Sequence, residues 1–353
     1  MLQAANVNTG SCDPFRPAIQ AATDRARAGG VPADSAGPIE CGDRRPNLAM
    51  ALKNDIAGRT PQLRDRKIDQ LASVIAGMNT GQGPDLLGVC EVENRFVIDR
   101  LIDRVNTTLP SPRNYAVVHA DTEDARGIDV AFIYDNTLFQ VPQPLEGSVF
   151  FHVVMRRHAT REIVQVNFKT TTTAARTWAV FGNHWPSRSG GQFESEGYRV
   201  IAGETLGYFH QRVLEVHGPL TPVLAMGDFN DEPFDPSLVR HALSTRQRAK
   251  VTSARENPLL WNLMWPIVGS PDGSFYFDNQ PNMLDQFLIN KNMATGDAPI
   301  KAYPATVQIL RPAAMLNPGI YPKPLPFGGM GKPVNQNGYS DHFPITIRVT
   351  DVD

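Results

Sequence analysis

Two polar residues follow an apolar stretch near position 228 and could act together on one phosphate group. Met226 is followed by Gly-Asp-Phe-Asn, which places Asp228 and Asn230 two positions apart. Side chains two apart on an extended backbone lie on the same face, so both can address one phosphate. Taken alone, the segment is equally compatible with an Asx-rich turn after a strand.

A second polar group stands near the C-terminus, where Ser340, Asp341 and His342 precede an apolar run. A carboxylate beside an imidazole offers a metal ligand next to a group for proton or phosphate chemistry. Hydrolysis of a phosphate ester needs an electrophilic metal, an oriented water and donors for the charge that develops. The two groups could supply these parts, although Ser-Asp-His also occurs in loops and helix caps.

Taken together, these segments resemble the signature of the endonuclease/exonuclease/phosphatase superfamily, which includes DNase I. Further segments resemble its remaining motifs in the expected order: Asn-Val-Asn at 6–8, Val-Cys-Glu at 89–91, Gly-Ile-Asp-Val at 127–130 after an Arg, Gly-Asn-His-Trp at 182–185, and Leu-Asp-Gln-Phe at 284–287. The matches span nearly the whole chain, so the resemblance predicts both the fold and the chemistry.

The resemblance implies a metal site. It implies that Glu91 is the principal ligand, with Asn6 and Asp341 nearby. The cofactor is expected to be Mg²⁺, with Mn²⁺ or Ca²⁺ as alternatives, because hard cations prefer oxygen ligands. Asn8 stands where some members carry Asp, and this departure favours a single tightly held metal.

The resemblance also implies catalytic roles. Asp228 would hold the attacking water, and Asn230 would bind that water or a phosphoryl oxygen. His342, oriented by Asp285, would be a general base or a phosphate contact, because a carboxylate fixes the tautomer and raises the basicity of its imidazole partner. His184 would face the leaving group as acid or charge stabiliser. The division of work between the histidines stays open, and His184 has no assigned acidic partner.

Substrate contacts are predicted at Asn183 and Arg126, which belong to matched segments, and at Arg188. Arg188 and Arg199 flank a predicted helix start and could clamp a phosphate in a bidentate manner. Surface ion pairing is the competing interpretation, and it is favoured for Arg199.

Three weaker features have structural interpretations. Trp261 and Trp265 fit the core or a pocket wall, and the segment from Phe327 to Lys332 lacks Walker spacing and reads as a turn. A basic group between two predicted strands is interpreted as a solvated hairpin rather than a polyanion contact; it comprises Arg156, Arg157, His158 and Arg161.

The patterns of apolar residues predict the elements. Helices are expected over residues 62–78, 94–109, 194–216 and 235–243. Strands are expected over residues 84–91, 115–120, 128–134, 147–155, 161–169, 177–183, 222–226, 282–289 and 343–349. The Gly- and Pro-rich stretches 10–46 and 295–336 are expected to be insertions. The prediction is one α/β (α+β) domain over 1–353: a four-layer sandwich of two mainly antiparallel sheets, packed face to face with helices outside.

Composition narrows the class of protein. The chain has 353 residues, of which 41% are hydrophobic, and a net charge of −2. This balance excludes coating of nucleic acid by a broad basic surface. No apolar run of membrane-spanning length occurs, so we expect a soluble monomer, either cytoplasmic or secreted with its signal peptide absent from this chain. Cys90 reads as a buried small hydrophobe, and Cys12 and Cys41 form either a disulfide or free thiols.

Three functions compete. The favoured one is a metal-dependent phosphodiesterase or endonuclease that cleaves nucleic acid by in-line attack of an activated water. The alternative is a phosphatase or phospholipase C-like hydrolase of a small or lipid phosphoester, such as an inositol phosphate or sphingomyelin. A catalytically silent binding module is disfavoured, because each matched position holds a residue able to do its work.

Overall fold

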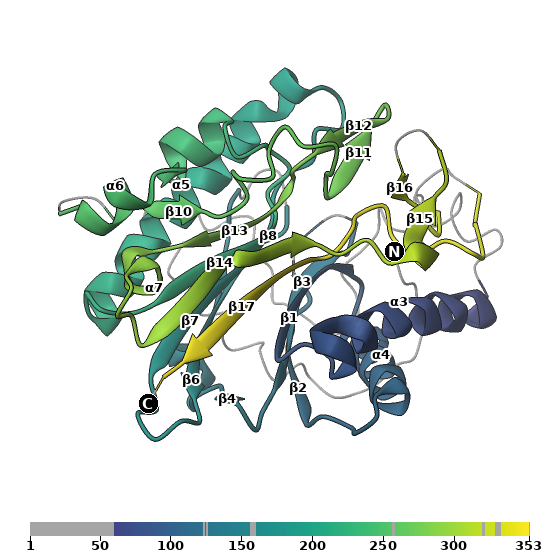
Figure 1. Cartoon of the computed structure of the whole chain (residues 1–353), viewed down its shortest axis with the longest axis horizontal. Coiled ribbons are helices and arrows are strands. Elements are labelled where there is room, and N and C mark those ends of the chain that lie inside the picture. The colour runs from purple at the N-terminus through teal and green to yellow at the C-terminus, as the bar shows by residue number, and fades with distance from the viewer. Residues whose placement is uncertain are drawn as a thin grey trace, which may run out of the picture.

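Two β-sheets pack face to face, with helices covering both outer sides (Figure 1). The structure is a computed structural model, and it describes residues 60–122, 124, 126–155, 160–255, 258–319, 322–328 and 333–352. Over these residues the predicted four-layer sandwich is confirmed.

The smaller sheet has the strand order β1-β3-β2 and is antiparallel throughout. Its strands are β1 (Leu86–Val92), β2 (Tyr115–Val118) and β3 (Asp129–Asp135). Helices α3 (Pro61–Gly81) and α4 (Arg95–Thr108) cover its outer face. Both helices begin with a side-chain cap, since Thr60 accepts a hydrogen bond from the N–H of Leu63 and Asn94 accepts one from the N–H of Val97.

The larger sheet has the order β4-β6-β7-β8-β13-β10-β9, with β5 also paired to β6. Only the β7–β8 and β9–β10 pairs are parallel. Its strands are β4 (Phe139–Gln140), β5 (Val149–His152), β6 (Ile163–Thr170), β7 (Thr177–His184), β8 (Val223–Asp228), β9 (Ser244–Thr245), β10 (Leu260–Asn262) and β13 (Asp285–Ile289).

The outer face of the larger sheet packs against α5 (Gln192–His217). Gly203 and Gly207 allow the π-helical turn η3 (Ser237–His241) to approach α5 closely, because a Cβ atom would lie 2.4 Å from the Ser237 carbonyl oxygen at Gly203 and 2.8 Å from the His241 carbonyl oxygen at Gly207. The short elements are α6 (Arg248–Ser253), α7 (Lys291–Ala294), η2 (Leu145–Gly147) and η4 (Ala313–Met315).

The period of two along β3 explains how one strand serves two layers. Val130, Phe132 and Tyr134 belong to the core between the sheets. Ala131 and Ile133 belong to the core beneath α3 and α4. Successive side chains of a strand point to opposite faces, so the central residues of a strand between two apolar layers, here 130–134, are apolar throughout.

The predicted surface insertion at 295–336 is wrong in its first part. Residues Ile300–Ile309 form strand β14, which pairs antiparallel with the last strand, β17 (Ile345–Asp351). Ile300 and Ala302 are buried in the core between the sheets. The Pro and the polar residues of this segment hid an alternation in which only every second side chain is buried at its start. Two hairpins complete the elements: β11 (Phe275–Phe277) with β12 (Gln280–Asn282), and β15 (Leu316–Asn317) with β16 (Lys323–Pro324).

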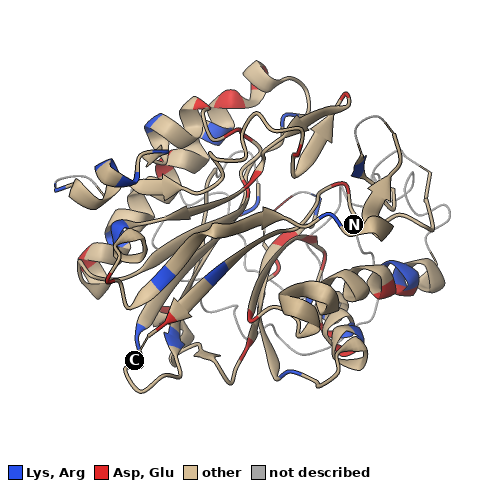
Figure 2. Ribbon diagram, in the orientation of Figure 1, with Lys and Arg blue, Asp and Glu red and all other residues tan. Residues whose placement is uncertain are grey.

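Charged residues of both signs are interspersed over the described ribbon (Figure 2). Several form ion pairs between neighbouring elements, such as Arg100 with Asp65 and Arg104 with Asp69 across α3 and α4. Among the described residues, no helix is long and apolar enough to cross a lipid bilayer.

Candidate active site

Three polar side chains form a row across neighbouring strands at one edge of the larger sheet. His184 ends β7 and pairs in register with Asp228, which ends β8. Asp228 in turn pairs with Asp285, which begins β13. Residues directly opposite each other in a sheet project to the same face, so the three side chains lie side by side. The Nε2 atom of His184 is 3.8 Å from Oδ2 of Asp228.

His342 joins this row from a different part of the chain. Its Nδ1 atom is 2.7 Å from Oδ2 of Asp285, which leaves Nε2 for chemistry. Burial alone would lower the pKa of His342, but the charge and hydrogen bond of Asp285, and then the charges of Asp228 and Asp341, raise it well above its usual value. The imidazole is therefore a cation at neutral pH in this arrangement.

Asp228 is the most constrained member of the row. The backbone N–H and the side-chain amide of Asn230 donate to its two oxygens, at 2.8 and 3.0 Å. Burial raises the pKa of Asp228 to about 7, helped by Asp285 and opposed mainly by His342. The carboxyl group can therefore exchange a proton near neutral pH.

Gly227 and Asn230, on either side of Asp228 in the sequence, have backbone conformations that their residue types favour. Gly227 has a φ of 129°, and a Cβ atom there would lie 2.1 Å from the carbonyl oxygen of Asn183 on β7. Asn230 has a φ of 51°, a left-handed conformation that Asn tolerates better than most residues. Its amide also donates to the carbonyl of Trp185 at 2.9 Å. Because this amide is used on Asp228 and Trp185, Asn230 orients the carboxylate.

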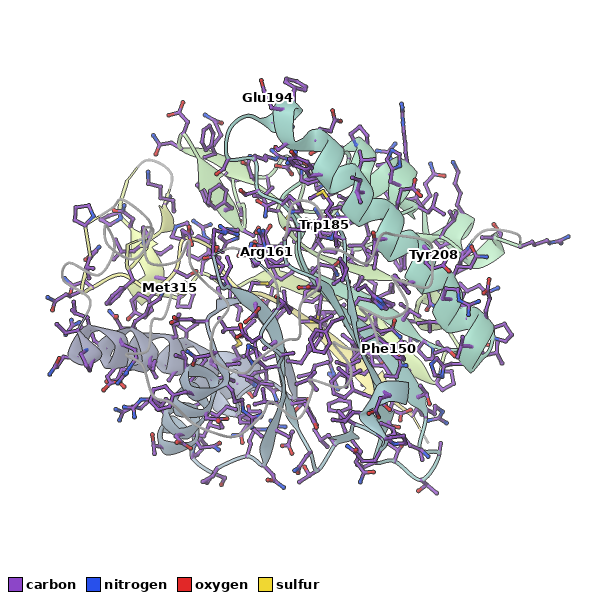
Figure 3. All side chains as sticks on the ribbon, turned by 180° about the vertical axis from the view of Figure 1, so that it is seen from behind. Phe150, Arg161, Trp185, Glu194, Tyr208 and Met315 are labelled. Atoms are coloured by element: carbon purple, nitrogen blue, oxygen red, sulfur yellow. The ribbon has the colours of Figure 1, made fainter. Side chains whose placement is uncertain are left out.

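Arg161 belongs to the same region. Its interpretation as part of a solvated hairpin is wrong, because the residue is buried. It donates to the Trp185 carbonyl at 2.6 Å, directly after His184, and its side chain is only 5% exposed (Figure 3). The carboxylate of Asp124 lies between Arg161 and Arg126, at 3.5 and 3.6 Å. Burial, followed by the charges of Arg161, Arg126 and His342, lowers the pKa of His184 well below its usual value. His184 is therefore neutral at physiological pH.

Three nitrogen atoms of this group are buried without a hydrogen-bond partner among the described residues: Nε of Arg161, Nη2 of Arg126 and Nδ1 of His184. Buried polar groups are nearly always satisfied in native proteins, so unpaired nitrogens at one place favour a bound anion. The order and direction of the strands could have predicted the position of Arg161. β6 runs antiparallel to β7, so residues just before β6 lie at the same edge as His184.

The predicted metal ligands Glu91 and Asp341 carry carboxylate oxygens, which are the kind of ligand that a hard cation prefers. Glu91 and Asp341 are exposed, and neither side chain has a hydrogen bond or ion pair to another described residue. Glu91 lies at a bulge of β1 with a φ of 59°, a strained conformation that often marks functional sites. Within the described residues no group of three His, Cys, Asp or Glu could hold an ion alone. Asn6, the third predicted ligand, and Asn8 lie outside those residues.

Cys90 connects the strand of Glu91 to the larger sheet. Its Sγ atom lies 3.5 Å from the carbonyl oxygen of Asn183. Burial raises the pKa of the Cys90 thiol above its usual range, and the carboxylates of Asp228, Asp285 and Glu91 raise it further. The thiol is therefore neutral and acts as a small apolar side chain, although Cys90 is only partly buried and not fully buried as expected.

Two residues predicted to contact the substrate, Asn183 and Arg188, have hydrogen-bond partners inside the protein. Asn183 is fully buried and donates to the carbonyls of Phe181 and Met226, while its side-chain oxygen accepts from the indole of Trp185. Arg188 binds the carbonyl of Asn230 at 2.8 Å and the carboxylates of Asp231 and Asp235. These contacts give both residues a role in supporting the backbone around the site.

Arg199 forms an ion pair, as interpreted, but this pair is buried in the protein and does not lie on its surface. It is fully buried, with Nε 2.6 Å from the carboxylate of Asp231. Trp261 and Trp265 are partly buried beneath the guanidinium groups of Arg248 and Arg246. The remaining predictions concern residues outside the described part of the chain: the insertion at 10–46, Cys12, Cys41, Arg156, Arg157, His158 and most of 327–332.

Comparison with known proteins agrees with this fold. A sequence model of the Endonuclease/Exonuclease/phosphatase family matches residues 58–351. The chain therefore belongs to this family, whose members are phosphoester hydrolases that generally use divalent metals. No curated protein matches the chain.

Solved structures share the fold at low sequence identity. The mannosyl-6-phosphatase Bt3783 of Bacteroides thetaiotaomicron has a TM-score of 0.50 and 15% identity, over 82% of this chain and 94% of that one. TDP2 of D. rerio, complexed with a single-strand DNA product, has a TM-score of 0.51 and 12% identity, over 82% and 94%. An endonuclease/exonuclease/phosphatase family protein from Bacteroides thetaiotaomicron has a TM-score of 0.50 and 15% identity, over 82% and 89%.

Proposed function

We propose that this chain is a divalent-metal-dependent phosphodiesterase that cleaves nucleic acid by in-line attack of water. The observation that carries the proposal is the row of His184, Asp228 and Asp285, joined by His342. It combines a carboxyl group that titrates near neutral pH, a cationic imidazole and a neutral imidazole within one site.

Asp228 is the residue best suited to accept the proton of the attacking water. A general base works best when its pKa is near the working pH, and burial brings the pKa of Asp228 to about 7. The two hydrogen bonds from Asn230 hold the carboxylate in one orientation. His342 is already protonated, so it acts as a donor and positive charge for a phosphoryl oxygen rather than as the base.

His184 and the two arginines complete the polar side of the pocket. A neutral imidazole can donate one hydrogen bond to a phosphoryl oxygen or to the leaving group without adding charge. The guanidinium groups of Arg161 and Arg126 supply the positive charge that the phosphate requires. When bound by Glu91 and Asp341, Mg²⁺ would polarise the phosphoryl group.

A second candidate is a phosphatase that acts on a small phosphomonoester. The pair of arginines favours it, because a terminal phosphate carries more negative charge than a diester. The interspersed surface charges also suit a small substrate (Figure 2).

The deciding experiment is a substrate panel with the purified protein in Mg²⁺, Mn²⁺ or Ca²⁺. The panel contains plasmid DNA, single-stranded RNA, bis-p-nitrophenyl phosphate, p-nitrophenyl phosphate and sphingomyelin. We expect cleavage of nucleic acid and of the diester, lost on chelation of the metal. Cleavage of the monoester alone would replace the diesterase with the phosphatase, and hydrolysis of none of the five would reject both.

A further inference from the structure

One short segment contacts both members of the His342–Asp285 pair. Ser274 is fully buried, and its hydroxyl group accepts a hydrogen bond from the backbone N–H of Asp285 at 3.0 Å. The carbonyl of Ser274 accepts a second one from the N–H of Phe343 at 2.8 Å. Since Phe343 directly follows His342, Ser274 links the backbones on both sides of the pair.

This link matters because the pair comes from two different strand systems. Asp285 begins β13 of the larger sheet, whereas His342 precedes β17, which pairs with β14. The two residues are 57 positions apart in the chain. Neither a shared strand pairing nor a short chain connection sets the 2.7 Å distance between their side chains. Ser274 supplies a direct structural connection between them.

Phe275, the next residue, covers the imidazole itself. The ring centroids of Phe275 and His342 are 4.8 Å apart, with 33° between their planes. The aromatic face restricts rotation of the imidazole and attracts it when it is positively charged. Together with the hydrogen bond to Asp285, this contact holds Nε2 of His342 in one direction.

The hairpin β11–β12 holds Phe275 in this place. Asp278 and Asn279 at its turn have φ values of 47° and 61°, as a two-residue type I′ turn requires. Gly273 closes the hairpin at its base, where a Cβ atom would lie 2.6 Å from the backbone nitrogen of Asn282. Phe277 lies on the same face of the strand as Phe275, two residues further, and is 71% exposed.

We propose that Ser274 and Phe275 are positioning residues for the reaction, which fix the distance and ring orientation of the Asp285–His342 pair. This inference rests on the proposed function, since it assigns a purpose to that same pair. In this role both residues act through the Asp285–His342 pair and not through contact with the substrate. Their removal should therefore slow the chemical step without weakening substrate binding.

The test compares Phe275→Ala and Phe275→Tyr with Phe277→Ala as the matched control, using the best diester substrate of the panel. We expect Phe275→Ala to lower kcat about tenfold or more with KM unchanged, because small misplacements of reacting groups are costly. Phe275→Tyr keeps the ring and should restore kcat, and Phe277→Ala should behave like the unaltered protein. Wild-type kcat in Phe275→Ala, or a raised KM with intact kcat, would overturn the proposal.

Ser274 is tested separately with Ser274→Ala and Ser274→Thr. The Ala variant should lose kcat by about tenfold, and the Thr variant, which keeps a hydroxyl acceptor, should recover it. Thermal unfolding checks that each variant of Ser274 and of Phe275 folds. If Phe275→Ala does not fold, Phe275→Leu replaces it. Wild-type kcat in a folded Ser274→Ala protein would remove Ser274 from the proposal.

A spectroscopic measurement separates this inference from the proposed function. The ring current of Phe275 should displace the ring-proton resonances of His342 in NMR spectra, which are assigned with His342→Gln. The displacement should disappear in a folded Phe275→Leu or Phe275→Ala protein and persist in Phe275→Tyr. If the protein hydrolyses nothing, the function fails while this shift still tests the contact. If the resonances do not move, the positioning inference fails even in an active enzyme.

Discussion

His184 lies 3.8 Å from Asp228, and His342 binds the neighbouring Asp285, yet the charges around the two histidines differ in sign. His342 is surrounded by carboxylates, which raise its pKa well above the usual value despite burial. His184 is buried beside two guanidinium groups and His342, and its pKa falls well below the usual value. Two identical side chains thus become a cation and a neutral donor. The charges on the neighbouring strands, rather than the residue type, set the role of each histidine.

The largest effect is expected when the charge of Asp228 is removed. Asp228→Asn keeps the size of the side chain but cannot accept a proton, so we expect kcat to fall about 10³-fold. In the unaltered protein, activity should decline as the pH falls below about 7, because the base must lose its proton. Steady-state kinetics from pH 5 to 9 measure both effects.

Asp235→Asn serves as the control for this experiment. Asp235 binds Arg188 on the neighbouring loop and takes no part in the row. A folded Asp228→Asn enzyme with near-normal kcat, or an equal loss in Asp235→Asn, would contradict the assignment of Asp228 as the base.

A second prediction concerns Arg161, whose positive charge adds to burial in lowering the pKa of His184. Removing its charge with Arg161→Met should raise the pKa of His184 toward its usual value, because that charge is the largest cause of the shift after burial. We expect kcat/KM to fall about tenfold through loss of a phosphate contact. NMR titration of His184 measures the pKa, and Arg161→Lys, which keeps the charge, should change it less. An unchanged titration in Arg161→Met would remove Arg161 from the surroundings of His184.

A third buried histidine shows what happens without neighbouring charges. His210 on α5 is fully buried, neither ring nitrogen has a hydrogen-bond partner among the described residues, and burial lowers its pKa to about 4. The unfolded chain binds a proton near pH 6.5 while the folded one does not, so stability falls as the pH drops from about 6.5 to 4. The loss should be roughly 3 kcal/mol.

His210→Leu should reduce this acid sensitivity and leave kcat at neutral pH unchanged. Urea unfolding at pH 7.5 and pH 4.5 measures the difference between the two proteins. Equal pH dependence in both would show that His210 is protonated in the folded state.

The smallest effect is expected at Arg188, which the structure assigns to loop support. Arg188→Ala should lower the free energy of unfolding by about 1–2 kcal/mol, since Asp231 is buried and loses a charged partner. The KM for the diester should remain within about twofold of the original, because a residue that does not touch the substrate contributes little to binding. A large rise in KM without loss of stability would restore Arg188 as a substrate contact.

Apolar periodicity was sufficient to predict most elements before any coordinates. The apolar run at 128–134 predicted the strand β3, and the 3.6-residue period predicted α4 within one residue at each end. The period failed at β14, where polar residues and a Pro concealed a strand with one buried face. These predictions succeed because a helix or strand that buries one face needs apolar residues at a regular spacing. That spacing can be seen within a short segment of the sequence.

The types and order of the site residues were likewise determined by the sequence, as the motifs around Glu91, Asp228 and His342 show. Only the tertiary structure decided which of them meet. Strand register placed His184 and Asp285 on either side of Asp228 and brought Arg161 to the same edge. Packing turned Asn183 and Arg188 inward, and long-range charges separated the protonation states of the two histidines. These properties depend on distances between residues far apart in the chain, which a local pattern does not contain.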